Sequence, residues 1–146
     1  MATNTIQENW FNFFKASNNQ DYILKKIDFC LSQVGLLKAM NQPVANLSHG
    51  DCRKLEIAMA LASDAQLLLL DEPMAGLGPT ETKEMIALLN KLKGQQTILL
   101  IEHDMDAVFA LADRISVLVS GEIIATGEPD KIRRDSVVQS AYLGEM

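Results

Sequence analysis

The stretch LLLLDEPMAGLG, residues 67–78, places four leucines directly before two adjacent carboxylates and a proline. The leucines do not alternate with polar residues, so they predict a strand that is buried on both faces. A buried strand holds its terminal backbone rigidly, and Pro73 restricts the backbone just after the acids. We therefore expect Asp71 and Glu72 to point toward a fixed place beyond the carboxyl end of the strand, where open parallel sheets bind ligands.

Two adjacent acids at a strand end suit phosphate chemistry. The first acid, Asp71, continues the strand and can hold Mg²⁺ directly or through water. The second, Glu72, can polarise a water molecule for attack on phosphorus. Four hydrophobic residues followed by Asp-Glu is the Walker B pattern. A strand that ends in solvated acids also fits many other α/β proteins, so this stretch alone leaves both interpretations open.

The surrounding sequence alternates strands and helices. Strands are expected over residues 67–70, 97–101, 115–119 and 123–125, with a turn at Gly121-Glu122. Helices are expected to begin after Ser48, Gly78 and Asp104, and Gly94 is expected to end the second as a C′ residue, with Met85, Ile86, Leu89 and Leu92 facing inward. Residues 5–40 also have helical spacing, with a boundary near Pro43. This order predicts a parallel α/β layer with right-handed crossovers.

Composition and charge exclude several functional classes. The chain has 146 residues, 48% hydrophobic and 22% charged, as in a soluble globular protein. Its net charge of -6 argues against a nucleic-acid partner. Cys30 and Cys52 lie outside any CxxC pattern, which predicts neither disulfides nor a zinc site and favours a reducing cytosol. No signal peptide or membrane span is indicated, so we expect contact with a membrane only through partners.

Two further motifs point to phosphate. Ser48-His49-Gly50-Asp51 precedes a helix, whose first N–H groups and positive dipole end can bind a phosphate. An ordinary N-cap is the alternative. His103 follows the strand over residues 97–101, where its imidazole can hydrogen-bond a γ-phosphate, although a histidine at that place can equally be a plain surface residue.

Taken together, the motifs resemble those of the ATP-binding-cassette (ABC) transporter ATPases. The matching stretches are LSHGD (47–51) for the signature loop, LLLLDEP (67–73) for Walker B, AGLG (75–78) for the D-loop and EHD (102–104) for the switch histidine. The longer stretches LSHGDCRKLEIAMALA, LLLLDEPMAGLGPTET, ILLIEHDMDAVFALADRISVL and AYLGE resemble the ATPase subunits of branched-chain amino acid importers, over about residues 5–145. The resemblance implies an α/β fold: a partial P-loop NTPase core (47–127) with a mostly parallel sheet, a helical subdomain before it (1–46) and a helical tail after it (128–146).

The resemblance also implies roles for single residues. Asp71 would assist Mg²⁺, Glu72 would be the general base, and His103 would contact the γ-phosphate of ATP. The signature residues Ser48, His49, Gly50 and Asp51 would bind nucleotide held by the opposite subunit, and Ala75, Gly76, Leu77 and Gly78 would form the D-loop. The implied partners are transmembrane permease subunits and a second ATPase subunit, identical or different. The implied location is the cytoplasmic face of the plasma membrane.

The sequence departs from the family pattern in several places. His49 and Asp51 stand where Gly and Gln are usual, and Gly78 stands where the D-loop commonly has Asp, which weakens any inference about communication between the two sites. GxxxxGK[ST] is absent, and no Q-loop is visible. Without that loop most of the triphosphate binding energy has no source, so we expect a C-terminal fragment that is inactive alone. In relatives the strand leading into the loop lies between those ending at Asp71 and His103, which predicts a gap in the sheet.

Other functions stay open. The chain could be a non-catalytic partner or regulatory module that donates its signature loop to a complete ATPase. A phosphate-responsive switch of the response-regulator type would need an acid at a first strand and a lysine at a last one, and neither arrangement is present. The transported substrate also stays open, since importers of urea and amides look similar to those of branched-chain amino acids.

Overall fold

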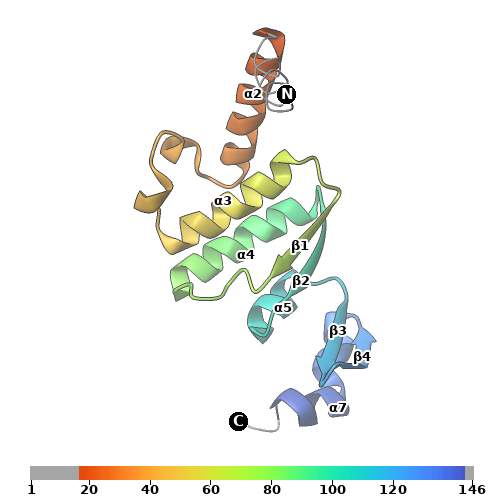
Figure 1. Ribbon diagram of the computed structural model, residues 1–146. Coiled ribbons are helices and arrows are strands. Elements are labelled where there is room, and N and C mark those ends of the chain that lie inside the picture. Colours follow the sequence, from red (N-terminus) through yellow and green to blue (C-terminus); the bar gives the residue numbers. More distant parts are fainter. Residues whose placement is uncertain (1–16, 144–146) are drawn as a thin grey trace, which may run out of the picture. The chain divides into compact units, whose positions relative to one another are not determined.

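A computed structural model of the protein describes residues 17–143 (Figure 1). The chain divides into two compact units, Met1–Leu68 and Leu69–Met146. The elements are α2 (Ser17–Gln33), η1 (Leu37–Ala39), η2 (Val44–Asn46), α3 (His49–Ala62), β1 (Leu67–Asp71), α4 (Pro79–Lys93), β2 (Thr97–Ile101), α5 (Met105–Leu111), β3 (Ile115–Val119), β4 (Glu122–Gly127), α6 (Pro129–Arg134), α7 (Ser136–Val138) and η3 (Gln139–Leu143). The part of the predicted N-terminal helix before Ser17 lies outside the described residues. No helix among residues 17–143 combines the length and the apolar character that a bilayer crossing requires.

Within residues 17–66, the first unit consists of the helices α2, η1, η2 and α3 and the segments that join them. Ser48 is the N-cap of α3, and its Oγ accepts a hydrogen bond of 3.1 Å from the amide of Asp51. Ile57 and Ala58 are the buried apolar residues of this helix, whereas Met59 is 67% exposed. Helices α2 and α3 contact each other.

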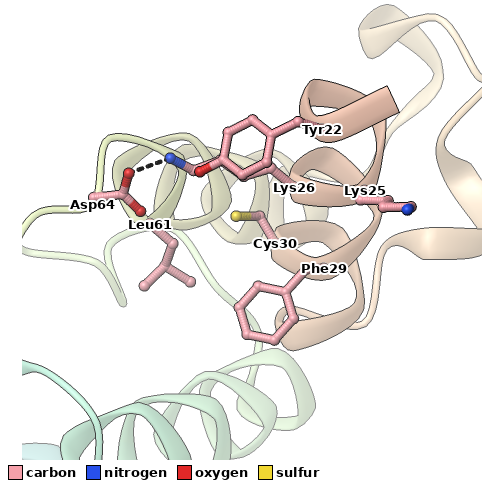
Figure 2. A pocket seen from close by; sticks show the side chains of 7 residues that line it. All are labelled: Tyr22, Lys25, Lys26, Phe29, Cys30, Leu61 and Asp64. Carbon is pink, nitrogen blue, oxygen red and sulfur yellow. Dashed lines mark hydrogen bonds and ion pairs between the residues drawn. The ribbon is translucent and has the colours of Figure 1, made fainter. Parts of the chain in front are cut away.

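A small cavity of about 250 Å³ lies between α2 and the C-terminal end of α3 (Figure 2). Tyr22 and Phe29 flank it from α2, and the buried thiol of Cys30 lies near its floor. An ion pair between Lys26 and Asp64 crosses its rim and links the two helices. This contact fixes the packing of α2 against the segment that follows α3.

In the α/β part, β1 and β2 form a small parallel sheet, and α4 is the helix that connects the two strands. The two strands pair directly, and the amide of Glu72 donates a 2.9 Å hydrogen bond to the carbonyl of Ile101 just beyond β1. The predicted gap between these strands is therefore wrong. Strand β3 lies in a different sheet from β2, so the expectation of one continuous parallel layer that includes residues 115–119 is also wrong.

The leucine strand is buried on one face only. Leu68 is 2% exposed, whereas Leu67 and Leu69 are 49% and 68% exposed. On β2, Leu99 and Ile101 are also more than half exposed. A parallel strand is buried on both faces only where both faces of its sheet are covered. The described chain covers one face, so the expectation of burial on both faces is wrong.

Helix α4 begins and packs as predicted. Gly78 is its N-cap, and Glu81 Oε2 accepts a 3.1 Å hydrogen bond from the amide of Gly78. Its buried residues are Met85, Leu88, Leu89 and Leu92; Ile86 is half-buried. Gly94 ends the helix as expected, but as its C-cap, with a φ of -71°, and not as the C′ residue. The carbonyl of Leu92 instead accepts from the amides of both Gln95 and Gln96, and this closes the helix.

The strands β3 and β4 form an antiparallel hairpin. Its turn residues are Ser120 and Gly121, both with positive φ (49° and 86°), which matches the twist that a two-residue hairpin turn needs. Glu122, expected in the turn, pairs with Val119 in the ladder instead. A second core joins this hairpin to α6 and α7; its buried residues are Ile115, Val117, Ile132 and Val138.

Candidate nucleotide site

The carboxyl ends of β1 and β2 bring together Glu72, the candidate general base, and His103, the candidate switch histidine. Nδ1 of His103 lies 3.3 Å from Oε1 of Glu72. Both side chains are accessible, with 50% of Glu72 and 73% of His103 exposed. Asp71, the last residue of β1, is also exposed. This arrangement gives one edge of the sheet a carboxylate pair with an imidazole beside it.

The backbone of Glu72 is in an unusual conformation. Its φ of +45° lies in the left-handed region, which costs a residue with a Cβ about 1 to 2 kcal/mol. Such a conformation persists only where neighbouring contacts fix it, and it is found most often at functional sites. Here the Glu72 amide is held by Ile101, and the Glu72 carbonyl accepts a 3.0 Å hydrogen bond from the amide of Ala75.

Glu102 makes the second link between the two strand ends. Its Oε1 accepts a 2.9 Å hydrogen bond from the amide of Met74, and its Oε2 lies 3.2 Å from the amide of His103. The side chain of Glu102 is half-buried, and Met74 is 7% exposed. The carboxylate therefore connects the backbone after Glu72 with the backbone of His103.

The predicted D-loop forms a tight turn after the acids. The amide of Leu77 donates to the carbonyl of Met74 at 3.1 Å, and Gly76 takes a φ of 76° in that turn. Only glycine adopts such a φ without strain, so the glycine in this motif has a local structural reason. Ala75 and Leu77 flank it, and Gly78 then starts α4.

The signature residues lie at the N-terminus of α3. Ser48 and His49 are exposed, and Gly50 is buried. The carboxylate of Asp51 lies 3.6 Å from Nζ of Lys54, one turn along the helix. The Ser48 hydroxyl accepts the capping hydrogen bond through its oxygen and keeps its O–H as a donor. The exposed start of this helix therefore offers backbone and hydroxyl donors of the kind that bind phosphate.

No cluster of three or more His, Cys, Asp or Glu side chains within residues 17–143 is arranged to enclose a metal ion. Asp71, the predicted ligand of Mg²⁺, lies at the exposed end of β1. Magnesium commonly takes only one or two protein carboxylates and completes its shell with water and phosphate oxygens. The single carboxylate is compatible with that mode of binding.

Glu102 directly follows the strand expected over residues 97–101, but no role was predicted for it. The signal that identifies it is Pro73, which has no N–H. Met74 supplies the next backbone donor after Glu72, and β2 has already ended there, so a side-chain acceptor on the neighbouring segment is required. An acid directly after the second strand is the obvious acceptor.

The strand that ends in adjacent acids and the capped helix that carries LSHGD are features from which the resemblance to the ABC family was drawn. The family model for the ABC transporter matches residues 1–75, and that for the branched-chain amino acid ATP-binding cassette transporter matches residues 122–146. The chain therefore belongs to the ABC transporter family, which confirms the resemblance drawn from its motifs.

Individual relatives agree with this assignment. The chain is 47% identical over 117 residues to the high-affinity branched-chain amino acid transport ATP-binding protein LivG of Escherichia coli (strain K12), covering 79% of this chain and 46% of that protein. It is 43% identical to the corresponding protein BraF of Pseudomonas aeruginosa, with the same coverage. The chain thus spans about half the length of the curated relatives it matches.

Solved structures confirm the fold. The ADP conformation of MJ1267, an ATP-binding cassette of an ABC transporter, superposes with a TM-score of 0.76 at 29% identity, covering 84% of this chain and 50% of that one. CbiO1 from Clostridium perfringens, part of the transporter complex cbiONQ, gives 0.75 at 29% identity, covering 91% of this chain and 54% of that one. The partial P-loop NTPase fold is therefore established.

Proposed function

We propose that this chain is part of the ATP-hydrolysing subunit of an ABC importer, in which Glu72 is the general base and His103 contacts the γ-phosphate. The observation that supports it most is the 3.3 Å approach of Glu72 Oε1 and His103 Nδ1 at the end of two paired strands. A base and a phosphate contact must lie together for in-line attack by water. The branched-chain amino acid substrate class is supported by the names of LivG and BraF.

The two side chains would divide the chemistry between them. The Glu72 carboxylate would accept a proton from the attacking water. A protonated His103 has two N–H donors, so it can donate from Nδ1 to Glu72 and from Nε2 to the γ-phosphate. Asp71 would hold Mg²⁺, directly or through water. When bound, the ion would neutralise part of the negative charge of the phosphates.

The signature helix would serve a second nucleotide. Ser48 and Gly50, together with His49 and Asp51, would meet a γ-phosphate held by an opposite ATPase subunit. The exposed Ser48 hydroxyl and the positive end of α3 are suited to that contact. Permease subunits would then recruit the dimer to the inner face of the membrane, and urea or amide importers remain alternative settings.

Hydrolysis also needs a phosphate-binding loop with its lysine, and the 146 residues contain no GxxxxGK[ST]. We expect a polypeptide limited to these residues to hydrolyse no ATP by itself. Co-expression with a segment that carries the loop should restore phosphate release. That activity should fall at least about 100-fold in Glu72→Gln and stay unchanged in Glu122→Gln, an exposed glutamate on β4.

A second candidate function predicts a different result in the same experiment. If the chain only donates its signature loop to a complete ATPase, turnover will persist in Glu72→Gln and fall in a Ser48 variant. The exposed Ser48 and His49 are the observation that favours this alternative. Loss of turnover on Glu72→Gln would exclude it.

A further inference from the structure

We infer that Glu102 is a positioning residue that sets the general-base candidate Glu72 against the switch histidine His103. The inference rests on the proposed function for its catalytic consequence, but the contacts themselves are independent of it. Glu102 reaches both segments at once, through Oε1 to the Met74 amide at 2.9 Å and through Oε2 to the His103 amide at 3.2 Å.

The need for this side chain follows from the backbone. Backbone pairing of the two strands ends with the bond from the Glu72 amide to the Ile101 carbonyl. Pro73 contributes no N–H, so Met74 is the next donor, and it is buried. A buried amide without an acceptor is costly. The Glu102 carboxylate takes the place of the strand carbonyl that β2 no longer provides.

The contact also bears on the strained residue. Glu72 has a φ of +45° and lies between two anchored amides, its own and that of Met74. Anchors on both sides leave the backbone of Glu72 little freedom to relax toward right-handed values. Because Glu102 is the immediate neighbour of His103, the same carboxylate fixes the histidine's backbone. The 3.3 Å distance between Glu72 and His103 therefore depends on Glu102.

Three substitutions at position 102 separate the effect of side-chain length from the effect of its negative charge. Glu102→Gln keeps the length and one acceptor oxygen for Met74, but its NH₂ group cannot accept from the His103 amide. Glu102→Asp keeps the charge but is one methylene too short to hold both amides. Glu102→Ala removes the acceptor altogether. If the Met74 contact positions the site, Gln will stay near the parent in Met74 protection and lie between the parent and Ala in its effect on His103, and Asp will behave like Ala. A purely electrostatic role would leave Asp near the parent and make Gln behave like Ala.

The first measurement is made by NMR on the full chain. Hydrogen-exchange protection of the Met74 amide should fall at least about tenfold in Glu102→Ala and Glu102→Asp, and the imidazole ¹⁵N signals of His103 should shift. In Glu102→Gln the protection should stay within about threefold of the parent. Glu122→Gln is the matched control and should change neither signal. Unchanged Met74 protection in both Ala and Asp would overturn the inference, and if Ala does not fold, the Asp and Gln pair decides it.

The second measurement uses the chain assembled with a phosphate-binding loop. Glu102→Asp should lower kcat for ATP at least about tenfold while KM changes less than about twofold, because a misplaced base affects the reaction step more than binding. Glu102→Gln, which keeps the Met74 contact and loses the His103 contact, should lose less kcat than Glu102→Asp. Equal losses in Gln and Asp would contradict positioning. If parent turnover does not depend on Glu72, the proposed function fails, whereas the exchange experiment still decides whether Glu102 holds the two segments.

Discussion

The amide of Glu72 donates to the carbonyl of Ile101 at 2.9 Å, although Glu72 already lies beyond the end of β1. This one bond extends the strand pairing to the acidic residue itself. It also means that the residues after Ile101 leave the sheet beside those after Glu72. His103 consequently stands 3.3 Å from the Glu72 carboxylate, with Glu102 between the two backbones.

His103 is expected to matter for turnover more than for folding. It is 73% exposed, so His103→Ala removes little packing. Loss of one donor to a reacting phosphate should lower ATP turnover about 100-fold in the chain assembled with a phosphate-binding loop. Steady-state phosphate release measures this, and Asn90→Ala, an exposed change on α4, is the control. Full activity in His103→Ala would remove the histidine from the mechanism.

Because Glu72 has a left-handed backbone, replacing it with glycine should relieve backbone strain while it removes the carboxylate that activity needs. Glycine accepts a φ of +45° without the Cβ penalty, whereas alanine does not. Glu72→Gly should therefore be about 1 kcal/mol more stable than Glu72→Ala in urea unfolding, while both are inactive. At Asn90, an exposed residue in the interior of α4, the same pair should reverse, with alanine the more stable. An alanine variant as stable as the glycine variant would mean that the backbone at position 72 is not strained.

Local signals in the sequence were sufficient for most elements. Ser48 and Asp104 cap α3 and α5 as expected, because a side-chain oxygen before an apolar helix face satisfies orphan amides wherever the helix lies. The strand over Thr97–Ile101 and the start of α4 at Gly78-Pro79 were also predicted correctly. These features depend on residues within one turn of each other.

Features that depend on distant segments were not predictable in the same way. An apolar run such as Leu67–Leu70 signals a buried strand but does not state whether both faces are covered, and Leu69 is 68% exposed. The order of strands in a sheet is likewise a long-range property. The sequence predicted a gap between β1 and β2, but the two strands pair directly. The positive φ of Glu72 had no sequence signal, since glutamate gives no indication of left-handed backbone.

Ser48 allows its structural and functional roles to be separated. Ser48→Ala removes the acceptor for the Asp51 amide and should destabilise the chain by about 1 kcal/mol. Ser48→Asp keeps a good N-cap, so stability in urea should be near that of the parent. Its carboxylate would nevertheless repel an incoming phosphate, so signature-dependent turnover should fall in Ser48→Asp despite normal stability. Turnover that follows stability across the two variants would assign Ser48 a capping role alone.

The ion pair between Lys26 and Asp64 predicts a pH dependence in the alkaline range. The side-chain hydrogen bond to Asp64 raises the pKa of Lys26 above its ordinary value of 10.5, outweighing the opposite effect of burial. A cation whose pKa is raised in the folded state contributes its full stabilisation below the unfolded pKa. That stabilisation is lost as the pH rises from 10.5 through the folded pKa.

Urea unfolding of the parent and of Lys26→Met between pH 9 and pH 12 tests this, a range chosen to bracket roughly the ordinary lysine pKa. The difference in stability between the two should be constant at the lower end and shrink toward the upper end. Lys25→Met, at the neighbouring position beside the same cavity, is the matched control and should leave the alkaline loss of stability as it is in the parent. Asp64→Asn should reproduce the Lys26→Met profile, because it removes the acceptor that raises the lysine pKa. A stability difference that stays constant up to pH 12 would show that the contact in Figure 2 does not persist in solution.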